Sequence, residues 1–105
     1  MQYLHKYQNG ALLIEIDDSR EHLPDLVFDA FIDEILSLIN VGETNVILNL
    51  IKKKHFNSSD LGVLIKVKDR LFENGIELYI MNPSDNILEL LKIVGLKDFF
   101  RVCKE

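Results

Sequence analysis

The sequence has little of what covalently stabilised or metal-binding small proteins need. In 105 residues it contains one cysteine, Cys103, two prolines and no tryptophan. A single cysteine can form no intramolecular disulfide and no multi-cysteine metal site, which excludes a disulfide framework. Because Cys103 lies two residues from the end of the sequence, we interpret it as a tail thiol without a function.

Positive charge is also scarce. Twelve Lys and Arg residues stand against seventeen Asp and Glu, giving a net charge of -5. A protein that grips duplex nucleic acid needs a basic footprint, so we expect no nucleic-acid partner. The first residues lack the apolar core of a signal peptide, and the longest apolar runs fall short of a membrane span. We therefore expect a soluble, cytoplasmic protein without a membrane partner.

Enzyme motifs are missing as well. The sequence has no Gly-rich phosphate loop, no G-x-S-x-G elbow, no H-E-x-x-H and no C-x-x-C. Its three histidines, His5, His22 and His55, lie far apart in polar surroundings, which is typical of surface residues. We predict a protein that is not an enzyme, with no catalytic residue, metal ligand or cofactor.

Apolar residues make up 48% of the sequence, enough for one compact core, and we expect a single domain over residues 1–105. Residues 11–16 predict a buried strand, preceded by the turn pair Asn9-Gly10 and a partner strand in a hairpin. Pro24 suits the first turn of a helix. Apolar residues then recur at helical spacing, and this helix is expected to end near Gly42.

The second half continues the alternation. Residues 45–51 read as a strand covered on both faces, residues 59–74 as the clearest helix, and residues 76–81 as another strand. Pro83-Ser84 opens a further helix that ends before Gly95, and residues 96–102 predict a short helix followed by an edge strand. Alternating strands and helices are typical of an α/β fold with a largely parallel sheet.

A polar segment separates the strand at residues 45–51 from the helix that follows. Its Lys52-Lys53-Lys54 run is interpreted as a solvated loop. The alternative is that these lysines meet an acidic partner or a phosphate. After them, Asn57-Ser58-Ser59 supplies three side chains able to cap a helix start.

This strand, polar loop and helix start resemble the STAS family, in which a strand leads into an Asp-Ser-Ser/Thr-Gly-Leu-Gly segment. The chain has Phe56-Asn57-Ser58-Ser59-Asp60-Leu61-Gly62, so Asn57 replaces the family's aspartate and Asp60 its first glycine. The resemblance extends over about residues 45–102. It implies a mixed sheet of four or five strands with helices packed mainly on one side.

Within the family the chain most resembles anti-sigma factor antagonists. The resemblance implies an anti-sigma factor with serine kinase activity and a phosphatase as partners, with phosphorylation at Ser58 in preference to Ser59. Two alternatives stay open, a STAS module that binds a nucleotide or lipid and a scaffold or accessory subunit that is not phosphorylated. The oligomeric state is left undetermined. The implied partner-binding residues are Asn57, Ser58, Ser59, Asp60, Leu61 and Leu64.

Overall fold

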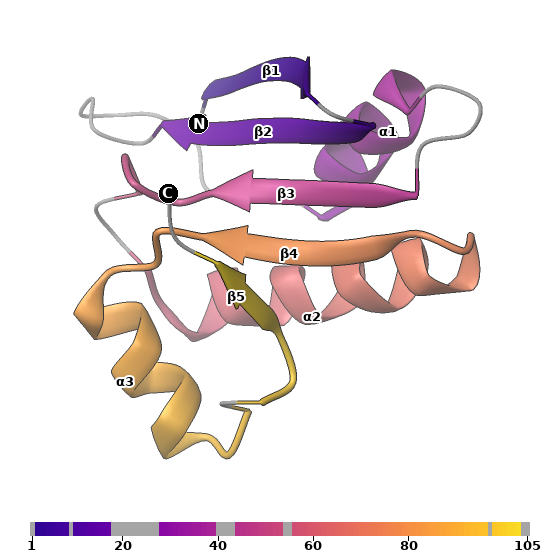
Figure 1. The fold of residues 1–105 in the computed structure, drawn as a ribbon. Helices are drawn as coiled ribbons and strands as arrows, with labels where there is room; N and C mark the ends of the chain where they lie inside the picture. The colour runs from indigo at the N-terminus through magenta and orange to yellow at the C-terminus, as the bar shows by residue number, and fades with distance from the viewer. Residues whose placement is uncertain are drawn as a thin grey trace.

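The computed structural model describes residues 2–8, 10–17, 28–39, 44–53, 56–96 and 98–103. These ranges contain five strands and three helices (Figure 1). In chain order the elements are β1 (Gln2–Gln8), β2 (Ala11–Asp17), α1 (Phe28–Leu38), β3 (Asn45–Asn49), α2 (Ser58–Glu73), β4 (Glu77–Met81), α3 (Asp85–Ile93) and β5 (Arg101–Cys103).

The strands form one sheet in the order β1-β2-β3-β4-β5. Strand β1 pairs antiparallel with β2, whereas β2, β3, β4 and β5 run parallel. Gly10, in the turn between β1 and β2, has a φ of 80°, a conformation that glycine adopts without steric cost. The predicted α/β class, the hairpin and the mixed sheet are thus confirmed.

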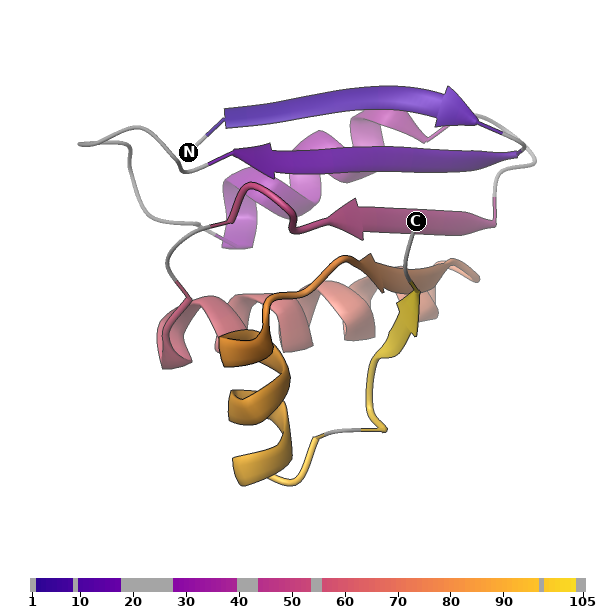
Figure 2. The same ribbon diagram turned by 60° about the vertical axis from the view of Figure 1, so that its left-hand side comes forward.

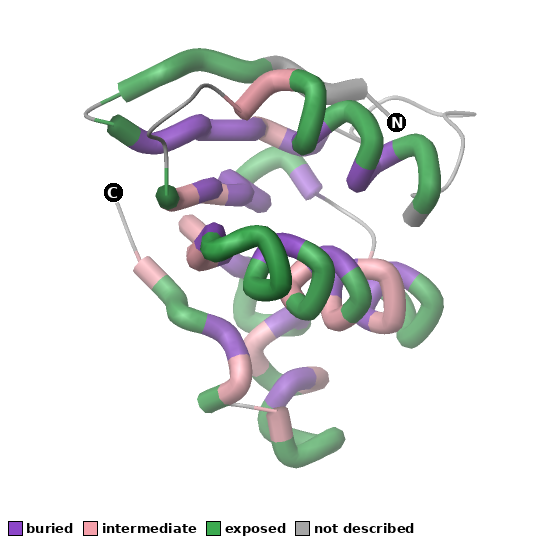
Figure 3. Tube along the Cα trace, turned by 90° about the vertical axis from the view of Figure 1, so that its right-hand side faces the viewer, coloured by how far each residue is buried: buried purple, intermediate pink, exposed green. Residues whose placement is uncertain are grey.

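Helices α1 and α2 lie side by side against one face of the sheet, as Figures 1 and 3 show. Successive right-handed crossovers between neighbouring parallel strands place their helices on the same side. Helix α3 projects beyond β4, near the edge strand β5 (Figures 1 and 2). In the part of the chain that the structure describes, no helix has the length and apolarity needed to span a bilayer.

The core fills the space between the sheet and the two helices. Alternate strand residues point into it, helices α1 and α2 supply most of the facing side chains, and α3 adds Ile87 and Leu91. The apolar spacing of the sequence predicts six core residues, Leu48, Leu50, Leu64, Ile65, Leu71 and Ile80. Five of them are buried, whereas Ile65 is only partly buried. The five are Leu48, Leu50, Leu64, Leu71 and Ile80.

Two expectations need correction. Strand β3 was predicted to be covered on both faces, but Ile47 is only half-buried, because the described helices cover one face of the sheet. Ile51, at the end of the same predicted strand, lies beyond β3 and is 57% exposed. Where a short helix was expected after Leu96, the described residues form turns that lead into β5. Pro24 and Gly42 lie outside the described residues.

Candidate functional site at the start of helix α2

Helix α2 begins directly after the loop that leaves the carboxyl end of β3. Asn57 is its N-cap residue, with an extended backbone at φ -124° and ψ -179°. The Asn57 side chain accepts a hydrogen bond of 2.9 Å from the backbone N–H of Asp60. In return, the Asp60 carboxylate accepts a 3.3 Å bond from the backbone N–H of Asn57. This reciprocal pair is a capping box, so Asn57 is the residue of the predicted trio that caps the helix.

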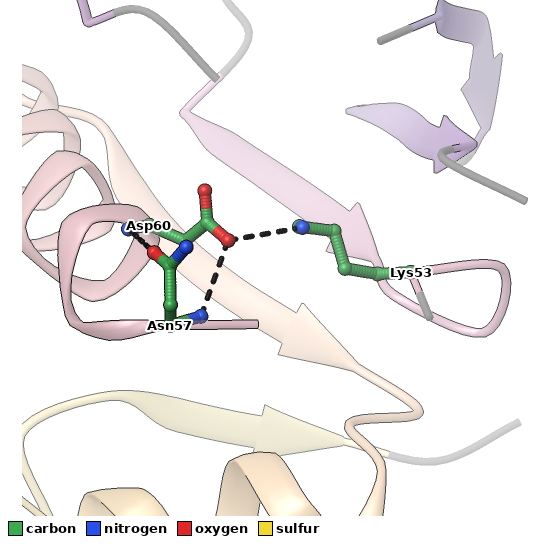
Figure 4. Close-up of polar contacts among 3 residues, drawn as sticks. All are labelled: Lys53, Asn57 and Asp60. Atoms are coloured by element: carbon green, nitrogen blue, oxygen red, sulfur yellow. Dashed lines mark hydrogen bonds and ion pairs between the residues drawn. The ribbon is translucent and has the colours of Figure 1, made fainter. Parts of the chain in front are cut away.

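The same carboxylate also binds a lysine of the preceding loop. Lys53 Nζ lies 3.2 Å from Asp60 Oδ2, and the two side chains are only 2% and 7% exposed (Figure 4). The ammonium group also lies 5.7 Å from the centre of the Phe56 ring, within the range of a cation–π contact. Because a buried charge is tolerated only when it is paired, this contact fixes the loop to the helix start.

The structure corrects the interpretation of the lysine run. Lys53 is buried and lies in a short turn, with its backbone N–H donating to the carbonyl oxygen of Leu50. Lys52 is half-exposed, and its ammonium lies 3.3 Å from a carboxylate oxygen of Glu15 in β2. Lys54 lies outside the described residues. A fully solvated lysine loop was therefore the wrong prediction for Lys53.

Ser58 and Ser59 are exposed and occupy the first two helical positions. Neither hydroxyl forms a hydrogen bond with a described residue, and the cap is formed by Asn57 and Asp60 instead. One turn further along, a Cβ built on Gly62 would meet no atom within 4 Å. A side chain at position 62 would therefore have room on the helix surface.

Three of the residues that the sequence analysis assigned to partner binding lie underneath this surface. Leu61 is 5% exposed and Leu64 is 1% exposed, and both belong to the core. Asp60 is buried in its ion pair. The residues that the structure leaves accessible are therefore Asn57, Ser58 and Ser59.

One anchoring residue was not recognised from the sequence. Asn49 ends β3 with its side chain buried, and its oxygen accepts bonds from the backbone N–H of Ile51 at 3.1 Å and from Asn82 Nδ2 at 3.3 Å. Asn82 follows β4 and has a φ of 56°, a region that asparagine adopts more readily than most residues. The loop before α2 is thus fastened at Asn49 and again at Lys53.

Other chemistry is sparse in the described ranges. They contain no group of three or more His, Cys, Asp or Glu side chains placed to hold a metal ion. His5 is exposed, and His22 and His55 fall outside the described residues. Cys103 lies in β5, partly buried, and burial raises the pKa of its thiol above the ordinary value.

The sequence over residues 23–105 matches the model of the STAS domain family. The chain belongs to the STAS domain family. Among curated relatives, the STAS chain is 36% identical over 61 residues to the anti-sigma-B factor antagonist of Staphylococcus aureus (strain NCTC 8325 / PS 47). That alignment spans 58% of the chain and little more than half, 56%, of the relative's length.

Solved structures show the same fold. The NMR structure of the protein TM1081 superposes with a TM-score of 0.77 at 14% identity, covering 99% of the STAS chain and 82% of that chain. The anti-sigma factor antagonist SpoIIAA in its unphosphorylated form gives a TM-score of 0.69 at 17% identity, covering 99% and 90%. SpoIIAA in the phosphorylated form gives 0.65 at 16% identity, covering 99% and 93%. At such identities these likenesses concern the fold.

Proposed function

We propose that this STAS chain is an anti-sigma factor antagonist that binds an anti-sigma factor with serine kinase activity through Asn57, Ser58 and Ser59. In the proposal, phosphorylation of Ser58 ends the binding and a phosphatase restores it. The observation that carries the proposal is the Ser58 hydroxyl, which is exposed at the first helical position and takes no part in the cap. Similarity to proteins named as anti-sigma factor antagonists supports it.

Ser58 is a favourable position for a charge switch. A phosphoserine carries about -1.5 to -2 charges at neutral pH. At a helix N-terminus the phosphate meets unpaired N–H groups and the positive end of the helix dipole, so the fold tolerates it. A partner that buries this surface must instead desolvate the dianion, which is unfavourable unless a cation receives it. The same modification is therefore compatible with the fold and incompatible with docking.

The buried ion pair supports an unmodified state that can dock. Asp60 replaces a glycine of the family motif, and an exposed carboxylate there would act as a permanent negative charge beside Ser58. Its side chain is instead only 7% exposed and lies against Lys53. Asp60 is thus unable to imitate an exposed phosphate, which favours the switch over a scaffold that has lost it.

The alternative of a nucleotide or lipid site has less support. It requires lysines of the run 52–54 to receive an anion at the helix start. Lys53 is already paired with Asp60, and Lys52 with Glu15. In the preferred account the chain is a substrate of a kinase and a phosphatase, is not itself an enzyme, and acts in the cytoplasm.

The test uses the purified chain, the kinase-type anti-sigma factor of its native host and Mg-ATP, with phosphopeptide mapping by mass spectrometry. We expect one phosphate on Ser58, its loss in Ser58→Ala, and its retention in Ser59→Ala. Ser84→Ala is a control for site specificity at a second exposed serine, the N-cap of α3, whose hydroxyl accepts a bond from the N–H of Ile87. Stable binding of the kinase without any phosphate transfer would replace the switch with the scaffold alternative.

A further inference from the structure

The contact between Lys53 and Asp60 joins two segments whose relative position determines how Ser58 is presented. Lys53 belongs to the loop after β3, and Asp60 belongs to the first turn of α2. The carboxylate oxygen that receives the ammonium at 3.2 Å also accepts the backbone N–H of Asn57. One oxygen atom thus holds the loop, the cap residue and the helix together (Figure 4).

A phosphate on Ser58 would compete with Asp60 for the same ammonium group. Ser58 and Asp60 are two residues apart in one helical turn, and both sit where the helix N-terminus favours anions. If Lys53 moved to the phosphate, the loop would leave its buried position and the surface around Ser58 would change shape. If Lys53 stayed, only the charge of that surface would change.

The burial of the pair decides between these outcomes. Removing the ammonium from Asp60 leaves a buried carboxylate without its partner, which is among the more costly changes in a protein interior. An ion pair between a lysine and an exposed phosphate is screened by water and contributes much less free energy. The balance therefore favours the existing contact, whether or not Ser58 is modified.

We infer that Lys53 and Asp60 are positioning residues of the Ser58 surface, whose buried ion pair keeps the loop and helix start fixed when Ser58 carries a phosphate. The inference rests on the proposed function only in taking Ser58 as the modified residue. It adds the two residues that hold the loop and the helix start in place beneath that surface. The family motif has glycine where this chain has Asp60, so the device is a property of this sequence.

The test installs phosphoserine at position 58 during translation, so that it needs neither the kinase nor the partner. Amide hydrogen exchange of residues 56–61 is compared between the unmodified and the phosphoserine protein. We expect rates that agree within about twofold, because the ion pair holds the segment in both. In the variant Lys53→Met/Asp60→Asn, which removes both charges and keeps an acceptor for the N–H of Asn57, we expect exchange at least about tenfold faster.

A second measurement reports where the ammonium group lies. The phosphate ionises with a pKa of about 6, and a lysine in contact with it lowers that pKa. By ³¹P NMR titration we expect the phosphate of phosphoserine 58 to have the same pKa in the protein with Lys53 and Asp60 as in the double variant Lys53→Met/Asp60→Asn. A distinctly lower pKa in the protein with Lys53 and Asp60, faster exchange on phosphorylation, or slow exchange in the double variant would overturn the inference. Failure of the kinase assay would leave these results unaffected, so the two proposals fail separately.

Discussion

Asn57 and Asp60 cap helix α2 through two reciprocal hydrogen bonds, from the backbone N–H of Asp60 to the Asn57 side chain and from the backbone N–H of Asn57 to the Asp60 carboxylate. The arrangement satisfies two amide groups that have no intrahelical partner. The Ser58 hydroxyl takes no part in these bonds. The residue that stabilises the helix start and the residue available for modification are therefore different.

This separation predicts a difference between two alanine variants. Asn57→Ala should lower the free energy of unfolding by about 0.5–2 kcal/mol, because it removes the N-cap acceptor. Ser58→Ala should change it by less than about 0.5 kcal/mol, as expected for an exposed side chain that makes no hydrogen bond with a described residue. Urea denaturation of both variants measures the difference. An equal or larger loss in Ser58→Ala would show that serine contributes to the cap.

The buried ion pair predicts a large loss on removal of its cation. Lys53→Met should destabilise the fold by about 3–5 kcal/mol, because the Asp60 carboxylate stays buried without the ammonium. Lys52→Met is the matched control. Its ammonium is half-exposed beside Glu15, and such pairs contribute about 0–1 kcal/mol. If chemical denaturation gave equal losses for the two lysines, the special role of Lys53 would be lost.

Substitution of Gly62 by alanine should have opposite effects on stability and on partner binding. Glycine inside a helix is less favourable than alanine by roughly 1 kcal/mol, and a Cβ at Gly62 meets nothing within 4 Å. Gly62→Ala should therefore stabilise the free protein, as thermal unfolding would report. If a partner packs against the helix beside Ser58, the added methyl group should weaken binding in a titration. An unchanged affinity would place the docking surface away from Gly62.

The reactivity of the Cys103 thiol should depend on pH differently in the folded and the unfolded protein. Burial raises the pKa of this thiol, so at a given pH the folded protein holds less thiolate than the unfolded chain. The thiol's contribution to the free energy of unfolding is present at pH values below the thiol pKa of the unfolded chain. It is lost as the pH rises through the thiol pKa of the folded protein. The rate of alkylation by iodoacetamide rises with pH as the thiol ionises. This rise should occur at a higher pH in the native protein than in the protein unfolded in urea. Coincident pH profiles would contradict the expectation.

Much of the fold follows from local sequence patterns. The helical spacing after Ser59, the glycine that ends it and the apolar run at residues 11–16 all reflect periodicity and turn preferences within one segment. The burial of strand β3 was harder to predict, because whether Ile47 is covered depends on which sides of the sheet the helices occupy. That depends on the order of the strands, which no single segment reveals.

The site was predictable in position and less so in detail. Three consecutive residues could cap the helix, and only the reciprocal bond with Asp60 selects Asn57. The pairing of Lys53 with Asp60 depends on how the loop turns inward. The sequence alone does not indicate which of several consecutive lysines is buried. Leu61 follows the exposed Ser58 and Ser59 within one helical turn but points into the core, since helical residues one to three positions apart face different directions.

The most direct test of the account is the affinity of the Ser58→Asp variant for the kinase-type anti-sigma factor of the native host, measured by calorimetry beside Asn86→Asp. Asn86 is exposed in the first turn of α3, so both variants place a new carboxylate where a helix start favours it by roughly 0.3–1 kcal/mol. We predict that both proteins are at least as stable as the parent, and that Ser58→Asp alone loses the partner. Binding of Ser58→Asp with the affinity of the parent protein, or equal losses in the two variants, would contradict a charge switch at Ser58.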